Sequence, residues 1–470
     1  MENLIGADNV SNDFYKVSEY CLNHVAKNIF GMNRHESYLV ARPKSVKQVA
    51  ELVRYAHSNG IPVFIRGGGS GYAGGDVASE SGIVLEMTGL NRVLEVDRDG
   101  GYVKCEAGIS VKELNNYLEK FALWWPHDPG SREWATVGGS ISTLGVGAFS
   151  TKYGYASDSV TGMTIVTADG DTVKVGSKVK HHDSSYNLTD TITSGEGTLC
   201  IVVEVTLKVF KKPQERAVGI GIFEKFEDAV KFCYDLFDSG WYPESLMLED
   251  SLRFTLESLA PFIDIQSPSV EELKLGPQKT VAIFSYAGTY EAVQTSTAHT
   301  KSLIVSNGGT VVGDEGIIKA YWKSKTELPS WSKEVGNLKV HSFVPSVPLN
   351  KAPEFSRKYA EIAGTLKLAP IGARYYVTLP TFECTISPTV MFDDDNESAT
   401  HAYEEFTRIF SREVIRMEGS PASTTGVGMK LVEIIEKLED TQQLKLARQI
   451  KAAFDPSKLL NPGKKLSKWL

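Results

Sequence analysis

The sequence lacks the features that define several large classes of protein. No apolar run is long enough and free enough of charge to span a bilayer. The N-terminus, Met1–Ile5, has no basic segment followed by an apolar core, so we expect no signal peptide and a cytoplasmic protein. Positive charge is in deficit, with 50 Lys and Arg against 58 Asp and Glu. The resulting net charge of -8 gives no electrostatic support to a nucleic-acid-binding role.

Cysteine is also scarce. The chain has 5 cysteines, and none of them forms the C-x-x-C pair that is typical of metal or redox centres. An odd number of cysteines dispersed along the chain indicates buried thiols in a reducing compartment. The composition, with 42% hydrophobic and 23% charged residues, is that of an ordinary globular protein, and 470 residues suggest about three domains. The five cysteines are Cys21, Cys105, Cys200, Cys233 and Cys384.

Glycine, in contrast, is abundant and clustered. A strand-like apolar run, Ile61–Ile65, leads into Gly67–Gly75, where six of nine residues are glycine. Glycines allow the backbone to adopt a positive φ, which we expect at Gly68, and to approach a ligand closely. Successive free N–H groups form a concave nest for phosphate oxygens. Arg66 and Ser70 add a cation and a hydroxyl to such a pocket. A flexible surface loop is the competing interpretation of this run.

A second glycine cluster, Val137–Gly147, favours the ligand-binding interpretation. Both clusters lie next to strand-like sequence. Two such loops can hold the two ends of one long dinucleotide.

Periodicity predicts that residues 36–212 mix helices and strands and carry both glycine clusters. Ser45 begins a helix that ends at Gly60. The sequence Ser110–Glu113 is a capping box that begins a second helix. Asp169-Gly170 predicts a hairpin turn. The predicted strands are 61–65, 83–87, 93–96, 102–106, 163–168, 172–175 and 201–209.

A domain boundary is predicted at Lys211-Lys212-Pro213, where polar residues and a proline end a strand. Beyond it, strands and helices alternate in a pattern that suits an antiparallel sheet with helices on one face. A final helix before Asp455-Pro456 leads to the turn Asn461–Lys464. The predicted strands of this part are 218–223, 281–286 and 375–379, and the predicted helices are 227–237, 291–305 and 400–417.

These motifs occur in the order and spacing of a known flavoprotein family. The chain resembles the vanillyl-alcohol oxidase/p-cresol methylhydroxylase superfamily of FAD enzymes, and within it the glycolate oxidase and D-lactate dehydrogenase large subunits. The resemblance implies an α+β fold, with a two-subdomain FAD-binding domain of the PCMH type and a ferredoxin-like cap built on an antiparallel sheet. The implied domains are residues 1–212, 213–429 (cap) and 430–470 (return to the FAD domain). The motifs that carry it are Arg66–Gly75, Asp128–Ser131, Thr136–Gly139, Tyr153–Gly154, Gly195–Leu199 and Asn461–Lys464.

The resemblance also implies which residues hold FAD. The first cluster matches the pyrophosphate loop, the second lies beside the diphosphate and flavin, and Asn461 matches a tail residue near the flavin ring. Covalent relatives carry a histidine where this sequence has Ser70, so non-covalent FAD is expected. The implied cofactor-binding residues are Arg66, Gly67, Gly68, Gly69, Ser70, Gly71, Gly74, Asp128, Ser131, Thr136, Val137, Gly138, Gly139, Ser142, Thr143, Gly145, Tyr153, Glu196, Gly197, Thr198, Ile201, Val202 and Asn461.

The second domain departs from the family pattern. The hydroxy-acid branch has an H-x-G-D-G-N-x-H stretch, and here Pro380 and Ser387 stand in place of its two histidines. A later G-E-H-G-x-G motif reads Ser423–Gly428, without its Glu and His. In relatives these residues bind a divalent metal and take the substrate proton, so we predict no metal site. The W-x-x-R motif retains a cation, Lys325, that can pair with an anionic substrate.

Other groups must then provide the acid–base chemistry. Arg374 can bind a carboxylate or phosphate in bidentate fashion. Tyr375, Tyr376 or His341 can relay the hydroxyl proton. Each has a structural alternative, because tyrosines pack strands, an arginine is often a surface cation, and a lone histidine is often structural. Together with Lys325 these are the candidate catalytic residues.

The expected reaction is oxidation of a C–OH group on a small, anionic substrate such as a 2-hydroxy acid. Electrons then pass to a protein or quinone acceptor, and an iron–sulfur subunit and a homodimer are both compatible with the resemblance. Two alternatives remain open. One is a flavoenzyme of the alkylglycerone-phosphate synthase type, which performs no net oxidation. The other is a flavin-bearing electron-transfer subunit.

Overall fold

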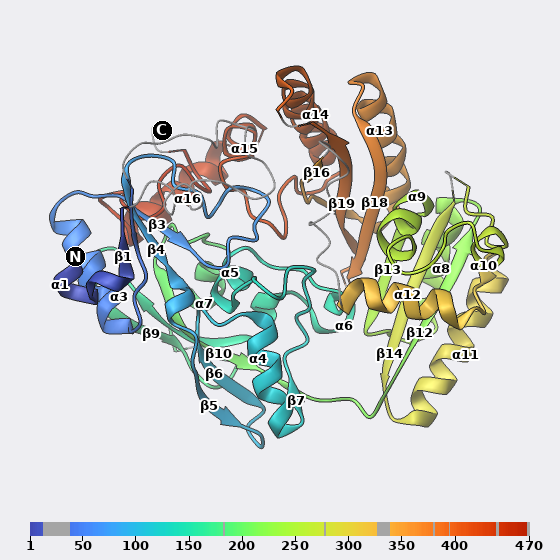
Figure 1. The fold of residues 1–470 in the computed structure, drawn as a ribbon, viewed down its shortest axis with the longest axis horizontal. Helices are drawn as coiled ribbons and strands as arrows, with labels where there is room; N and C mark the ends of the chain where they lie inside the picture. The colour runs from blue at the N-terminus through green and yellow to red at the C-terminus, as the bar shows by residue number, and fades with distance from the viewer. Residues whose placement is uncertain are drawn as a thin grey trace. The chain divides into compact units, whose positions relative to one another are not determined.

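The computed structural model divides by its internal contacts into two units (Figure 1). Unit 1 comprises Met1–Gly145, Tyr155–Lys211 and Ala422–Leu470, and unit 2 comprises Val146–Gly154 and Lys212–Pro421. No helix in the described part of the chain is long and apolar enough to cross a membrane. The structure describes residues 1–12, 38–181, 184–276, 279–326, 339–378, 381–393, 395–438 and 441–467.

In its described part, unit 1 contains two larger sheets and a two-stranded antiparallel sheet of β7 Leu123–Trp124 and β11 Phe210–Lys211. The first has the strand order β1-β2-β4-β3, and its β2–β4 and β3–β4 pairs are parallel. Helix α3 begins at the N-cap Ser45, whose hydroxyl accepts from Gln48 N, and it buries Val49, Leu52 and Val53 in the core of this sheet. The elements are β1 Val10–Ser11, β2 Tyr38–Ala41, α3 Val46–Ser58, β3 Val63–Arg66 and β4 Gly82–Glu86.

The second sheet of unit 1 is antiparallel throughout, with the order β5-β6-β10-β8-β9. The predicted capping box at Ser110 and Glu113 is present and begins α4, which confirms that prediction. The short helix α5 begins after Thr136. The elements are β5 Val93–Asp97, β6 Tyr102–Glu106, α4 Val111–Leu118, α5 Val137–Ser142, β8 Val160–Val166, β9 Thr172–Gly176 and β10 Ile201–Lys208.

The C-terminal part of unit 1 adds helices to this core. Helix α15 belongs to a small apolar cluster around Leu431 and Ile434. The last helix, α16, is followed by Leu460, which bridges to Val63 at the beginning of β3. The chain therefore returns to the strand that leads into the first glycine cluster. The bounds are α15 Val432–Leu438 and α16 Thr441–Phe454.

Unit 2 is built on one eight-stranded sheet, with the order β15-β12-β14-β13-β18-β19-β16 and with β17 paired to β19. All of its pairs are antiparallel, which confirms the antiparallel sheet predicted for this part of the chain. The strands are β12 Glu215–Phe223, β13 Ser245–Asp250, β14 Thr280–Gly288, β15 Thr310–Val311, β16 Lys339–Ser342, β17 Ser346–Pro348, β18 Ala369–Thr378 and β19 Glu383–Phe392.

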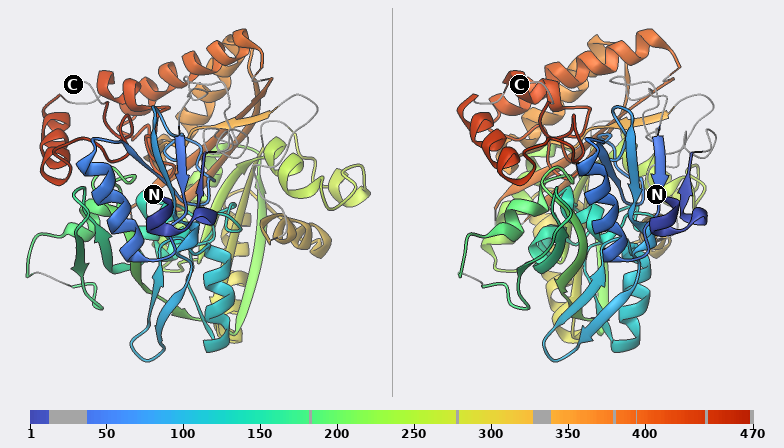
Figure 2. Two further views of the ribbon diagram at one scale, coloured as in Figure 1. Left: turned by 60° about the vertical axis from the view of Figure 1, so that its left-hand side comes forward. Right: turned by 90° about the vertical axis from the view of Figure 1, so that its left-hand side faces the viewer.

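Helices cover one face of this sheet. Helices α8 and α11 pack on β12 and β14, and α13 packs on β18 and β19 and lies beside α14 (Figures 1 and 2). The other face carries α9, the π-helix η6 and α12. These elements are α8 Phe226–Asp238, α9 Ser251–Arg253, η6 Phe254–Leu259, α11 Tyr290–Ser306, α12 Glu315–Thr326, α13 Ala352–Thr365 and α14 Glu397–Arg416.

Residues 146–154 belong to unit 2, although they directly follow the second glycine cluster. Their helix α6, Ser150–Tyr153, packs on β13 and β18. The Thr151 hydroxyl donates to the Val377 carbonyl at 2.8 Å and accepts from Leu246 N at 2.8 Å. This buried hydrogen bonding fixes α6 to the centre of the sheet.

Candidate functional site

The first glycine cluster forms a loop that begins at the end of β3. Gly69 and Gly74 have positive φ angles of 68° and 71°. The backbone N–H groups of four successive residues, Gly68 to Gly71, donate no hydrogen bond within the described part of the chain. Unpaired consecutive amides around a left-handed residue form a nest that binds anions. The local geometry therefore fits a phosphate-bearing ligand.

Arg66 lies beneath this loop. Its guanidinium is in close contact with Gly69, where an added Cβ would collide with it. Arg66 Nη1 lies 3.3 Å from Asp76 Oδ2, and both side chains are largely buried. Asp76 thus balances much of the charge of Arg66, which supports the loop from within the chain.

Gly68 differs from its expected conformation. A positive φ was expected at this glycine, but the left-handed residue is Gly69. A Cβ on Gly68 would overlap with the backbone carbonyl of Trp134, and one on Gly67 would collide with the Thr136 hydroxyl. Gly68 is required by the close approach of the Trp134 backbone, and Gly67 by the Thr136 side chain, rather than by a left-handed turn.

The second glycine cluster uses its first amides within the chain. Val137 N donates to Ile109 O at 2.9 Å, and Gly138 N donates to Ala107 O at 2.7 Å. Gly139 N donates to the hydroxyl of the N-cap residue Thr136 at 3.2 Å. The amides at the beginning of α5 therefore join this helix to the segment between β6 and α4.

Two distant segments fasten the end of the first loop. Asn461 Nδ2 donates to Gly75 O at 3.1 Å and to Glu196 O at 2.7 Å. The buried Glu196 carboxylate accepts from Val427 N and Gly428 N, both at 2.8 Å. The structure thus brings together three of the predicted cofactor segments, and the Glu196 side chain is engaged in holding the 426–428 turn.

A cavity of about 550 Å³ in unit 1 adjoins the glycine loop through Gly67 and Gly68. Its lining also includes Arg66, Thr136 and Trp134. The remaining lining residues are polar or charged, or are glycine: Glu86, Thr88, Gly108, Ser110, Lys112, Glu113, Asn116 and Glu133.

Other predicted cofactor residues make contacts within unit 1. Asp128 pairs with Arg132 at 2.8 Å, and the Thr198 hydroxyl donates to Gly195 O at 2.7 Å. The Thr143 hydroxyl donates to Gly139 O. The Ser131 carbonyl accepts in a local turn, the Ser142 carbonyl accepts from Glu196 N at 3.2 Å, and the Gly145 carbonyl accepts from Ala156 N at 3.0 Å. Ile201 and Val202 lie in β10.

Tyr153 is placed differently, on α6 of unit 2. Burial raises the pKa of its hydroxyl to about 12, and the nearby Glu244 acts in the same direction. Its hydroxyl therefore stays protonated at physiological pH.

The unpaired amides identify what the site can hold. Besides Gly68–Gly71, the buried Asn461 Oδ1 has no hydrogen-bond partner among the described residues. Free donors in an anion nest and an orphaned acceptor next to it match the diphosphate and the polar groups of a dinucleotide. The residues present fit FAD, held by Gly68–Gly71 and by the tail residue Asn461.

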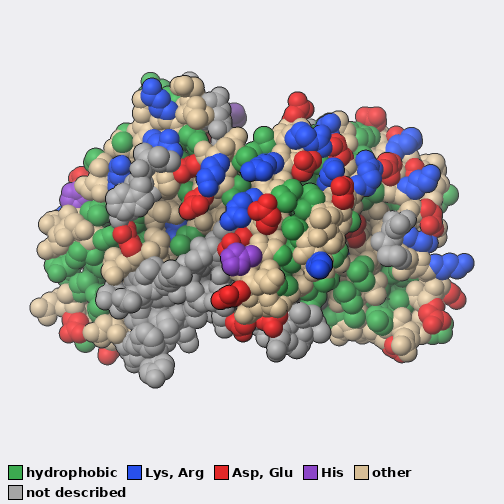
Figure 3. Space-filling view, turned by 90° about the horizontal axis from the view of Figure 1, so that it is seen from above, with side chains coloured by type: hydrophobic (Ala, Val, Ile, Leu, Met, Phe, Trp, Pro, Cys, Tyr) green, Lys and Arg blue, Asp and Glu red, His purple; other side chains and the backbone are tan. Residues whose placement is uncertain are grey.

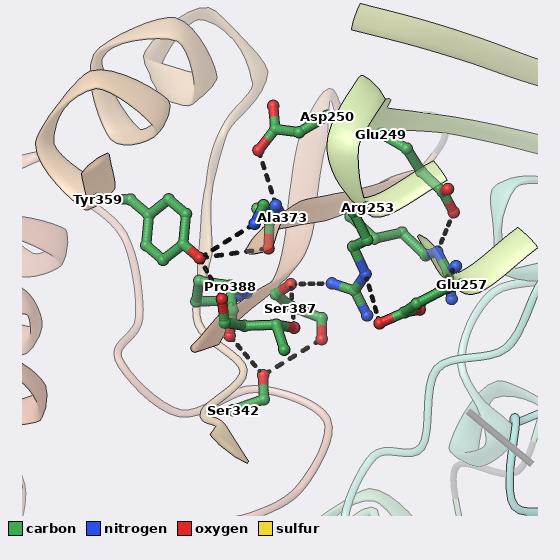
Figure 4. A network of polar contacts seen from close by, with 12 residues as sticks. Glu249, Asp250, Arg253, Glu257, Ser342, Tyr359, Ala373, Ser387 and Pro388 are labelled. Atoms are coloured by element: carbon green, nitrogen blue, oxygen red, sulfur yellow. Dashed lines mark hydrogen bonds and ion pairs between the residues drawn. The ribbon is translucent and has the colours of Figure 1, made fainter. Parts of the chain in front are cut away.

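In unit 2 the candidate residue Arg374 lies in a buried network of charges. Figure 4 labels three other members of this network, Glu249, Arg253 and Glu257. The Nε atom of Arg374 contacts Glu249, the residue directly opposite on β13, and its Nη2 lies 3.3 Å from Glu257 Oε2. Arg253 Nε lies 3.2 Å from Glu257 Oε1. Burial alone would lower the pKa of Arg374, but the neighbouring carboxylates outweigh it and hold the pKa well above its ordinary value. Arg374 is therefore charged, and its Nε and Nη2 atoms are paired with carboxylates of the same unit.

This network leads to the following prediction. Arg374→Met leaves Glu249 and Glu257 buried with one counter-charge fewer, and we expect the free energy of unfolding to fall by about 3–5 kcal/mol. The matched control is Arg357→Met. Arg357 pairs with Glu227 on the surface, at 65% and 57% side-chain exposure, and its loss should cost less than about 1 kcal/mol. Chemical denaturation measures both changes, and equal effects would contradict the buried network.

The other candidate residues of unit 2 differ in burial. Tyr375 is fully buried on the helix-covered face, with its ring 4.8 Å from that of Phe226, and burial raises its pKa well above the ordinary value. His341 is 1% exposed and stacks on Phe392 at 4.1 Å. Tyr376 points to the opposite face from Tyr375 and is only partly buried. Lys325 belongs to α12, but its side chain lies outside the described residues.

The positions of the altered histidine motif carry hydroxyl groups and backbone contacts. The Ser387 hydroxyl lies 3.2 Å from that of Ser342, and the Ser387 carbonyl accepts from Arg253. Pro380 lies outside the described residues. In the parts of the chain that the structure describes, no three His, Cys, Asp or Glu side chains gather in a way that could hold a metal ion.

The surface carries no extended region of one charge on the face seen in Figure 3, where basic and acidic side chains of the described residues are interspersed. Helix α14 illustrates this pattern. Its Arg408 lies 3.1 Å from Glu405, and its Arg416 lies 3.0 Å from Glu413. Such exposed pairs add solubility and little stability.

Several residues of the site were not found by sequence reasoning. Trp134 supplies the carbonyl against Gly68, and Val427 and Gly428 supply the amides that hold Glu196. Their contribution is made by the backbone, so no side-chain type marked them. Glu249 and Glu257 were missed because only the pairing of β13 with β18 brings them to Arg374.

Two protein families match the chain. The FAD binding domain family matches residues 38–176, and the family of FAD linked oxidases, C-terminal domain, matches residues 212–465. A nest of free amides in the first and an antiparallel sheet in the second define a two-part flavoprotein. The chain belongs to the FAD-linked oxidases, and its cofactor is FAD.

Similar proteins of known name cover nearly the whole chain. The D-lactate dehydrogenase of Archaeoglobus fulgidus is 28% identical over 435 residues, covering 92% of this chain and 92% of its own length. The glycolate oxidase subunit GlcD of Bacillus subtilis is 25% identical over 436 residues, covering 91% and 89%.

Solved structures show the same fold at lower identity. p-Cresol methylhydroxylase has a TM-score of 0.80 at 16% identity, covering 99% of this chain and 95% of its own. An alkyldihydroxyacetonephosphate synthase has a TM-score of 0.76 at 20% identity, covering 97% and 84%. These likenesses confirm the predicted fold class of an FAD-binding domain of the PCMH type joined to an antiparallel-sheet domain.

We predict that the FAD is bound without a covalent link, because Ser70 stands where a linking histidine is found in covalent relatives. The purified protein should be yellow and should release intact FAD when acid or heat denatures it. Absorbance of the supernatant after precipitation measures the release. Flavin that stays with the precipitated chain would contradict the prediction.

Proposed function

We propose that this FAD-linked oxidase oxidises the C–OH group of a small anionic substrate, with 2-hydroxy acids such as D-lactate and glycolate as the first candidates. The observation that carries the proposal is the likeness to a D-lactate dehydrogenase and a glycolate oxidase subunit over more than nine tenths of the chain, through both domains. Bound FAD supplies the hydride acceptor for such an oxidation. The electrons then pass to a protein or quinone acceptor.

The protein must supply a group that takes the hydroxyl proton, and Tyr376 is our candidate. It is partly exposed, whereas Tyr375 and His341 are buried in the core. It shares a sheet face with the charged guanidinium of Arg374, which is coupled electrostatically to it. It also precedes Val377, which is bonded to α6, the helix that follows the second glycine cluster.

Recognition of the substrate's negative charge is assigned to Lys325 of the W-x-x-K motif rather than to Arg374. The Arg374 guanidinium is engaged by Glu249 and Glu257 and has 5% side-chain exposure. Binding a substrate carboxylate there would require breaking a buried ion pair, which is strongly unfavourable. Arg374 instead places a fixed positive charge beside Tyr376.

The proposed reaction uses no divalent metal. Ser387 offers only a neutral hydroxyl where metal-binding relatives have an imidazole, and a hydroxyl is a poor ligand for a zinc-like ion. Turnover should therefore persist after chelation and removal of bound metal.

A cytoplasmic location is part of the same proposal. Four cysteines, Cys105, Cys200, Cys233 and Cys384, are buried and unlinked thiols. Free thiols persist in a reducing compartment.

The test is an anaerobic screen of small hydroxy acids and related alcohols against the purified holoprotein, with flavin absorbance as the readout. Bleaching by a 2-hydroxy acid, unchanged by EDTA, is the expected result. Spectra of a flavin adduct without net reduction would favour a synthase-like activity. A flavin that no compound reduces would favour an electron-transfer subunit, and both of these outcomes contradict the proposal.

A further inference from the structure

Lys464 is a buried lysine in the last turn of the described chain. It is 2% exposed, and its Nζ has no hydrogen-bond partner among the described residues. An ammonium group removed from water without a partner is expensive, so buried lysines are paired, neutral or reserved for a ligand. Its Nζ also forms no ion pair with a carboxylate within 4.0 Å among the residues that the structure describes.

The turn that carries Lys464 lies against the end of the first glycine loop. Asn461 Nδ2 donates to Gly75 O, and the Ser79 hydroxyl donates to Pro462 O at 2.8 Å. Gly463 is close enough to Ser79 that an added Cβ would lie 3.3 Å from its hydroxyl oxygen. The same loop carries the unpaired amides of Gly68–Gly71.

The carboxylates that act on Lys464 also make other contacts, although Asp76 Oδ1 is buried without a hydrogen-bond partner among the described residues. Asp76, Glu196 and Glu80 all favour its charged form. Asp76 lies 3.3 Å from Arg66, and Glu196 accepts from two amides and lies 3.6 Å from Lys465 Nζ. On α16, Lys451 is paired with Asp455. Burial outweighs these carboxylates and lowers the pKa of Lys464 to about 7.

We propose that Lys464 is the side chain whose charge changes when FAD binds. Its Nζ takes up a proton when the FAD diphosphate binds to the amides of Gly68–Gly71. Arg66, another cation at the loop, is paired with Asp76. A diphosphate adds negative charge next to the turn and restores the protonated form of Lys464. The inference rests on FAD as the cofactor and not on the proposed reaction, so failure of the substrate screen leaves it intact.

The protonation of Lys464 makes the FAD affinity depend on pH. A group whose pKa is raised by the ligand makes binding tighter at low pH and weaker as the pH rises above the pKa of the free protein. The FAD dissociation constant should therefore increase about tenfold per pH unit between pH 8 and 9. At pH 8, binding should take up about 0.9 proton, from a group with a pKa of about 7.

The experiment is calorimetric titration of the full-length apoprotein with FAD at pH 8, in two buffers of different ionisation enthalpy. Wild type should take up close to one proton, and Lys464→Met should take up none and bind FAD more weakly. Lys464→Arg, which stays charged, should also take up none, and its affinity should not vary with pH. The matched control is Lys465→Met, which removes the neighbouring, 38% exposed lysine and should retain the wild-type proton uptake.

Two further ligands identify the source of the charge. ADP should reproduce the proton uptake and riboflavin should not. If Lys464→Met does not fold, Lys464→Arg still decides the question, because it keeps the buried cation. Wild-type binding without proton uptake would overturn the proposal. Unchanged uptake in Lys464→Arg, or uptake with riboflavin but not with ADP, would do so as well.

Discussion

Flavin reduction in Tyr376→Phe is expected to be about 10²- to 10⁴-fold slower than in wild type, the range typical for loss of a general acid–base group. The substitution removes one hydroxyl from a side chain that is only partly buried, so the fold should be unaffected. FAD content and melting temperature should equal those of wild type. Stopped-flow absorbance under anaerobic conditions, with the substrate that reduces the wild-type flavin, measures the rate.

The neighbouring tyrosine provides the comparison. Tyr375→Phe makes the same chemical change one residue earlier, on the opposite face of β18, where the ring packs against Phe226 and Phe355. Its rate should remain within a few-fold of wild type. Equal loss in the two variants would indicate a general effect on the strand. Loss in Tyr375→Phe alone would assign the proton relay to Tyr375.

FAD binding in Gly68→Ala is expected to be about 10- to 100-fold weaker. The added methyl group overlaps with the Trp134 carbonyl, and the loop and the 134–136 segment must move apart. Overpacking of this kind costs about 1–3 kcal/mol, and each 1.4 kcal/mol of it that falls on the bound state is a tenfold change in affinity. Equilibrium dialysis or fluorescence titration with FAD measures the effect.

Gly71→Ala is the matched control for stability. Its φ is not in the left-handed region, and the nearest atom to an added Cβ is Asp76 Oδ1 at 3.7 Å, an ordinary contact. The melting temperature of its apoprotein should equal that of wild type, whereas that of Gly68→Ala should fall. Wild-type FAD affinity and stability in Gly68→Ala would show that the close approach of the two segments is not needed.

The local elements of the fold were largely predictable from the sequence. The capping box at Ser110 and Glu113 and the helix that begins after Ser45 are present, because hydrogen bonds within one turn determine them. The hairpin at Asp169-Gly170 joins β8 and β9 as expected. Apolar periodicity identified most of the long strands, since each has a buried face.

What depended on contacts distant in sequence was not predictable. Gly68 was assigned a left-handed φ, but its small size is required by Trp134, a contact that no local pattern encodes. Arg374 was proposed as a substrate ligand, and only the register of β13 against β18 shows that Glu249 lies opposite it. Lys464 was visible in its motif, but its burial became apparent only from the packing of the tail on the glycine loop.

The candidate site likewise has one part that was predictable from local sequence and one part that was not. The glycine-rich loop predicted a phosphate ligand, because backbone amides bind anions regardless of the neighbouring side chains. The catalytic group was harder to identify, since Tyr375 and Tyr376 are adjacent and chemically identical. Strand alternation separates them in the structure, because Tyr375 is fully buried against α8 and α13 on one face, whereas Tyr376 is only partly buried on the face that carries η6 and α12.

The most direct test of the account is a stoichiometric anaerobic titration of the holoprotein with the hydroxy acid that reduces its flavin, combined with analysis of the product. The account predicts that one equivalent of substrate bleaches one equivalent of FAD and yields one equivalent of the 2-oxo acid, with the same result after chelation. Bleaching without a carbonyl product, or bleaching that stops when a stoichiometric metal is removed, would contradict it.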